Sequence, residues 1–211
     1  MEGGIPVVLA IVWLVNFGIS FWNARVTGQI WVESKQAGGF IRVLAWCGAI
    51  MSASGFIWCY AVIEAFVGRA FAPEYVTPAV FEGVLSLMYL IIIFPVLGTG
   101  LVIWATSLYE AWVRRDMVSV GTAAWNTFAQ AHNMYSAARG IPEAMRSTRN
   151  VFSGKGRDWK IDEGTAKGGA ALVVVLLVLA AVVLGIVTTA AIIMKYAGTR
   201  PLTDGKQLSH A

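Results

Sequence analysis

The chain has 211 residues, of which 57% are apolar and only 13% are charged, and its formal net charge is +4. A soluble domain usually carries about 25% charged residues, so this composition argues against one and favours an all-α integral membrane protein. Nine tryptophans add to the case, because tryptophan concentrates at membrane–water interfaces.

The first apolar stretch covers about residues 5–22. This is close to the length of helix that crosses roughly 30 Å of hydrocarbon. Residues 1–4 carry no basic charge, and no small-residue cleavage site precedes residue 25. We therefore expect a retained membrane span rather than a signal peptide.

The second apolar stretch covers about residues 40–67 and is interrupted only near its ends, by Arg42 and Glu64. Small residues recur at every fourth position within it, at Ala45, Ala49 and Ala53. This spacing allows close approach between membrane helices, so we expect the small face to pack against another helix, within the chain or between copies.

The third stretch covers about residues 80–109 and contains Pro95, with Gly98 and Gly100 shortly after it. Proline removes a backbone donor and tends to kink a helix. We therefore expect a bend or a break near Pro95, which would act as a hinge.

Two carboxylates, Glu64 and Glu82, lie just inside the ends of the second and third spans and flank the same short loop. An ionisable group within a span is a functional candidate, although both of these are shallow and solvation at the interface explains them better. If copies assemble in a ring, the two glutamates would form an acidic collar at the mouth of a pore.

The segment 110–167 is the largest polar region and is rich in basic residues. Apolar periodicity predicts two helices in it, with a stop at Gly140 and a new start at Pro142, so we expect a cytoplasmic amphipathic hairpin. Two uses are open: docking a partner protein or another copy, or lying on anionic headgroups. Interspersed acids argue against nucleic acid. The docking candidates are Trp125, Phe128, Tyr135, Arg139, Arg146 and Arg149.

The fourth span is the clearest, because residues 170–194 contain no charge. Ala181, Gly185 and Thr189 repeat the small-residue spacing seen in the second span. The chain then divides into a three-span region (1–109), the basic loop (110–167), the fourth span (168–195) and a polar tail (196–211).

Orientation follows the positive-inside rule, which places short basic loops in the cytoplasm. Basic residues concentrate between spans one and two and between spans three and four. We therefore expect both termini outside the cytoplasm, with a bacterial inner membrane as the default location. A re-entrant fourth segment would instead leave the tail inside.

No catalytic motif and no metal-ligand spacing occur in the sequence, so we expect neither an enzyme nor a cofactor. An enzyme acting on lipid finds no supporting cluster of residues. The remaining hypotheses are a non-enzymatic scaffold or anchor in an envelope assembly (secretion, conjugation, phage-related or defence) and a homo-oligomeric channel. The expected partners are the bilayer with its anionic headgroups and either further copies or other membrane subunits.

Overall fold

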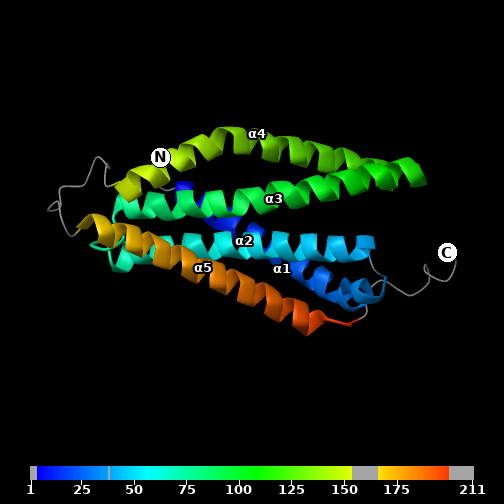
Figure 1. Cartoon of the computed structure of the whole chain (residues 1–211), viewed down its shortest axis with the longest axis horizontal. Helices are drawn as coiled ribbons and strands as arrows, with labels where there is room; N and C mark the ends of the chain where they lie inside the picture. Colours follow the sequence, from blue (N-terminus) through cyan, green and yellow to red (C-terminus); the bar gives the residue numbers. More distant parts are fainter. Residues whose placement is uncertain (1–3, 38, 154–165, 200–211) are drawn as a thin grey trace.

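The computed structural model describes residues 4–37, 39–153 and 166–199. These ranges contain five helices and no strand, which confirms the all-helical class (Figure 1). The helices are α1 (Gly4–Ala37), α2 (Gly39–Phe71), α3 (Pro78–Arg114), α4 (Met117–Ser153) and α5 (Ala166–Tyr196). Within the described ranges, α1, α2, α3 and α5 are the four helices long and apolar enough to cross a membrane, as the sequence predicts.

Successive helices run in opposite directions, so the bundle has two ends (Figure 1). At the end where Thr77 precedes α3, which we call the Thr77 end, Val151 of α4 and Val174 of α5 both meet Gly83. At the other end, which we call the Arg115 end, Gly28 of α1 lies against Ile193 of α5. The described part therefore begins at the Thr77 end and finishes at the Arg115 end.

The apolar core lies where α2, α3 and α5 meet, toward the Thr77 end. Its fully buried members include Ala65, Val80, Val84 and Val174. The turn into α3 is built locally: the Thr77 hydroxyl accepts a bond from the Val80 amide at 3.3 Å, and Pro78 fits the first helical turn.

Helix α1 continues to Ala37 and α2 begins at Gly39, so most of the basic segment between the first two apolar stretches is helical rather than a loop. Neighbouring helices cover the polar half of α1. The Trp31 and Trp46 rings meet edge-to-face, with 5.2 Å between their centroids. The Arg25 guanidinium lies 5.4 Å from the ring centroids of both Trp22 and Tyr196. These contacts explain how the helix accommodates charge beyond the first apolar stretch.

Helix α4 is one continuous helix, so the expected division into two helices is also wrong. Gly140 does not end it. Instead, a methyl group at Gly140 would stand 2.7 Å from Tyr89 Cζ, so glycine is needed for close contact with α3. The helix continues through Pro142, and α4 lies beside α3 along most of its length (Figure 1).

Helix α3 passes through Pro95 without a break, so of the two expectations only a bend stays a prediction. The Thr99 hydroxyl donates to the Pro95 carbonyl at 2.7 Å, one turn back along the helix. Gly100 faces Gln130 of α4, whereas the Cβ position of Gly98 is open. A hinge role for these residues stays a prediction.

Candidate functional site

A groove with a volume of about 380 Å³ lies over α2, between α1 on one side and α3 with α4 on the other. We call it the amide groove, because asparagine side chains enter its lining from both sides. The polar residues that line it are Asn16, Ser20 and Asn23 of α1, Ser54 of α2 and Asn133 of α4. Trp58, Ile92 and Val96 supply part of its apolar wall.

The asparagines of the groove differ in how they are bonded. Asn16 is held in place, since its Nδ2 donates to the Gly55 carbonyl at 3.1 Å and to Cys59 Sγ at 3.4 Å. Asn23 and Asn133 are half-buried and make no side-chain hydrogen bond within the described ranges. The groove thus contains two side-chain amides whose donors and acceptors have no hydrogen-bond partner in the described ranges.

The amide groove lies near the middle of the long apolar helices. Asn16 bonds to Gly55, at the centre of the apolar stretch of α2. Gln130, one turn before Asn133, donates to the Leu97 carbonyl at 3.3 Å, close to the centre of α3. Amides at this depth are unfavourable against lipid, so they are expected to face protein, water or a ligand.

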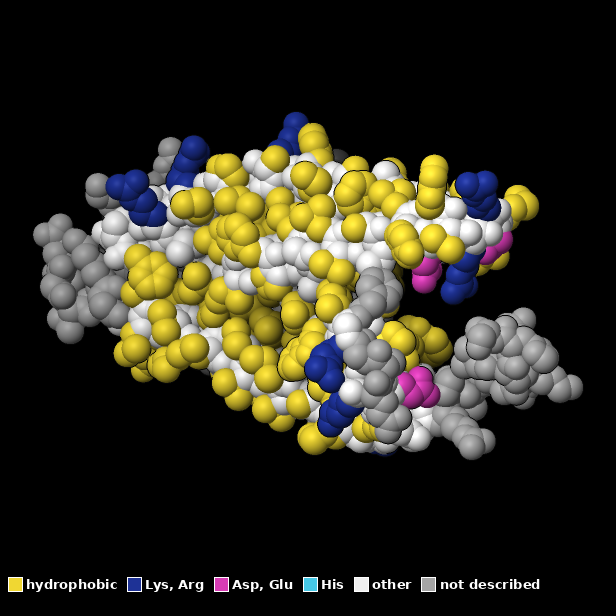
Figure 2. Space-filling view, turned by 45° about the vertical axis from the view of Figure 1, so that its right-hand side comes forward, with side chains coloured by type: hydrophobic (Ala, Val, Ile, Leu, Met, Phe, Trp, Pro, Cys, Tyr) yellow, Lys and Arg dark blue, Asp and Glu magenta, His cyan; other side chains and the backbone are white. Residues whose placement is uncertain are grey.

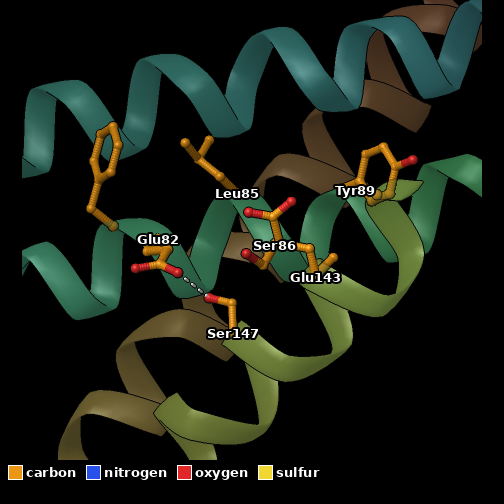
Figure 3. Close-up of a pocket in the computed structure, with 9 residues that line it drawn as sticks. Glu82, Leu85, Ser86, Tyr89, Glu143 and Ser147 are labelled. Atoms are coloured by element: carbon orange, nitrogen blue, oxygen red, sulfur yellow. Dashed lines mark hydrogen bonds between the residues drawn. The ribbon is translucent and has the colours of Figure 1, made fainter. Parts of the chain in front are cut away.

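A second polar pocket, of about 320 Å³, lies between α3 and α4 toward the Thr77 end (Figure 3). The Ser147 hydroxyl donates to Glu82 Oε1 at 2.7 Å, and Glu143 and Tyr89 line the same pocket. The Tyr89 hydroxyl also donates to the Ser136 carbonyl at 3.2 Å. These two hydrogen bonds hold α4 against the N-terminal part of α3.

This contact overturns one part of the sequence interpretation. That interpretation placed Glu82 on the outer side and the basic segment containing Arg146 and Arg149 on the cytoplasmic side. The Glu82–Ser147 bond brings them to the same end of the bundle. Both arginines are exposed there, beside the start of α3.

The second acid, Glu64, is half-buried, and its Oε2 is buried without a hydrogen-bond partner in the described part. Glu82 is instead engaged by Ser147. No hydrogen bond joins the two carboxylates within the ranges described. The acidic collar stays a prediction.

The small residues of α2 and α5 occupy one seam. Ala45 and Ala181 are fully buried, and a Cβ at Gly185 would meet the Ile57 backbone nitrogen at 2.8 Å. Farther along, the seam opens into an apolar groove of about 350 Å³. Ala49, Ala53 and Thr189 line that groove together with Trp31 and Trp46.

The aromatic residues of α4 point away from the bundle. Trp125 and Phe128 are 69% and 67% exposed, and their ring centroids lie 6.3 Å apart. The Arg139 guanidinium lies 4.8 Å from the exposed Tyr135 ring. Hydrophobic side chains cover much of the surface seen in Figure 2, with a few basic residues scattered among them.

The described ranges hold no group of three or more His, Cys, Asp or Glu side chains that could bind a metal ion. Comparison with family models, curated proteins and solved structures found no match to this chain. The amide groove, which sequence reasoning missed, therefore carries the functional argument. A signal was present, because Asn16 and Asn23 are seven residues apart and share one face of an apolar helix.

Proposed function

We propose that this chain is a non-enzymatic membrane subunit that self-associates through the amide groove and serves as a scaffold in a larger envelope-associated assembly. The observation that carries the proposal is the pair of unbonded amides, Asn23 and Asn133, that line a groove between the apolar helices. A polar group in this position is stabilised when a neighbouring helix supplies its partner.

The chemistry of the groove favours a second copy as the occupant. A primary amide both donates and accepts, so the same patch on two copies is self-complementary in a two-fold pair. Interhelical hydrogen bonds in membranes contribute about 0.6 kcal/mol on average and up to about 2 kcal/mol. Several such bonds, added to van der Waals packing, favour a specific pair.

The test is the mass of the intact particle in mild detergent, with crosslinking in the bilayer as a second measurement. We expect the unmodified chain, whose own mass is 22.7 kDa, to form a particle holding at least two copies. The double variant Asn23→Leu with Asn133→Leu should shift the particle to a single copy, because both unpaired amides are lost.

Asn150→Leu is the matched control, since Asn150 is exposed near the end of α4 and does not line the groove. It should leave the mass unchanged. A single-copy particle for the unmodified chain, without crosslinks in the bilayer, would refute self-association. So would a double variant that keeps its oligomeric mass.

A homo-oligomeric channel is the second candidate, and the same polar lining favours it, because amides and hydroxyls can solvate water and ions. This candidate predicts leakage from liposomes that contain the purified chain. Reduced leakage on Asn133→Leu would assign the path to the groove, and reduced leakage on Glu64→Gln or Glu82→Gln would assign it to an acidic mouth. Sealed liposomes would leave the scaffold as the better explanation.

A further inference from the structure

The face of α4 that packs against its neighbours has an unusual composition. Its least exposed residues are spaced alternately by four and three positions along the whole helix, as in a heptad seam. They are Ser119, Ala123, Asn126, Gln130, Asn133, Ala137, Gly140, Ala144, Ser147 and Val151. A water-soluble seam of this kind would consist mainly of leucine, isoleucine and valine. Small and polar residues instead characterise helix contacts inside membranes.

The outward face of α4 is mostly apolar, although Thr122 and His132 are also exposed on it. Over its first five turns it exposes Met117, Val118, Trp125 and Phe128, of which Met117 is 92% exposed. When the surrounding solvent is hydrocarbon, a helix is expected to direct its polar residues toward protein and its apolar residues outward. In water, a contiguous apolar patch of this kind is a liability for aggregation.

The length and depth of this face match a bilayer. Residues 117–138 contain no Asp, Glu, Lys or Arg and form about 33 Å of helix, against roughly 30 Å of hydrocarbon. The Trp104 indole of α3 donates to the Thr127 hydroxyl at 2.9 Å, and Tyr89 bonds to the Ser136 carbonyl. The uncharged part of α4 therefore lies beside the uncharged part of α3.

The charged residues nearest to this stretch in the sequence lie on either side of it. Arg115 and Asp116 precede it at the Arg115 end, and Arg139 to Arg149 follow it toward the Thr77 end. There the Ser147–Glu82 bond places the charged turns of α4 beside Glu82, near the start of α3. Charges at both ends and none between them are typical of a membrane-crossing helix.

From these observations we infer that α4 crosses the membrane as a fifth helix, with its aromatic face against lipid acyl chains. Five crossings in alternating directions place the start of α1 and the end of α5 on opposite sides. Arg115 and Arg149 then lie on opposite sides as well. This replaces the surface hairpin expected from the sequence, and it holds whether or not the chain self-associates.

The test is the labelling of single cysteines in the full-length chain with a membrane-impermeant maleimide, in sealed vesicles of one orientation. Cys47 and Cys59 are first replaced by alanine, and Arg115→Cys and Arg149→Cys are made separately in that background. Labelling in detergent shows that each site can react. We expect one site to react from outside intact vesicles and the other only after they are opened.

A third variant, Phe128→Cys, reports on the middle of α4. It should resist the water-soluble reagent in intact and opened vesicles alike, because it lies in hydrocarbon. Reaction of Arg115→Cys and Arg149→Cys from the same side would overturn the inference. Reaction of Phe128→Cys in vesicles would overturn it too. The same holds if Phe128→Cys is unreactive only while a partner protein is bound and reacts once that protein has been washed away.

Discussion

Helices α4 and α5 follow each other in the chain, yet they are held in the bundle in opposite ways. The buried seam of α5 is mostly apolar, with Val174, Val178 and Ala181 inside, and its exposed face carries Leu172 and Leu176. In α4 the seam is small and polar, while the exposed face carries the aromatic residues. Average hydropathy thus identifies α5 as a span and misses α4, because protein covers the polar side of α4.

Among the substitutions that test this difference in packing between α4 and α5, the one with the largest expected effect lies in α5. Gly185→Leu places a side chain against the Ile57 backbone, whose nitrogen would be 2.8 Å from the new Cβ. The backbone of α2 cannot rotate away, so the cost should exceed the roughly 1–3 kcal/mol typical of overpacking. We expect the yield of monodisperse protein, measured by size-exclusion chromatography, to fall severely.

Gly98→Leu is the control, since nothing lies within 4 Å of the Cβ position at Gly98 on α3. It should leave the yield near that of the unmodified chain, because leucine also has the higher helix propensity. Equal yields for the two variants would show that the contact between α5 and α2 is looser than the structure has it.

The second effect sharpens the comparison within α4 itself. Ala137 is 4% exposed in the seam, whereas Ala138 points outward. Ala137→Leu should lower stability by about 1–3 kcal/mol, because the larger side chain forces α4 away from α3. Ala138→Leu should be neutral or stabilising in a bilayer. The thermal midpoint in detergent measures both, and a reversed order would contradict the polar-inward assignment of α4.

The smallest effect concerns the start of α4, outside the apolar segments. The Ser119 backbone amide donates to Asp116 Oδ1 at 2.7 Å and holds the pKa of that carboxyl below its usual value. A lowered folded-state pKa means that the cap stabilises α4 above the ordinary aspartate pKa of about 4 and that this is lost as pH falls further.

Asp116→Ala should therefore lower the thermal midpoint slightly at neutral pH, and by less in acid, once the pH falls through the lowered pKa of the native carboxyl. Asp116→Asn keeps a capping oxygen and serves as the control. A loss of equal size at both pH values would show that the charge of Asp116 has no part in capping α4.

The sequence predicts the four apolar spans because each contains a long run without charge. Their ends are harder to predict, because they depend on neighbours. Helix α1 continues past Arg25, since the rings of Trp22 and Tyr196 flank that guanidinium, and Tyr196 is far away in the sequence. Local charge alone predicts a loop at this position.

The organisation of α4 was only partly accessible from its own residues. The stripe formed by Trp125, Phe128 and Tyr135 is visible as helical periodicity, and the structure places these side chains on the exposed surface. Gly140 looks like a stop signal until Tyr89 of α3 is seen against it. The amide groove is harder still, because four helices supply its lining and no single segment reveals it.

The polar seam of α4 has a consequence for how the protein is made. Asn126, Gln130 and Asn133 would meet acyl chains if α4 entered lipid alone, and each unsatisfied amide there carries a penalty. Helix α3 supplies hydrogen-bond partners for these amides, such as the Leu97 carbonyl, which accepts from Gln130. During synthesis, α3 and α4 should therefore leave the insertion machinery together, as one unit paired before release.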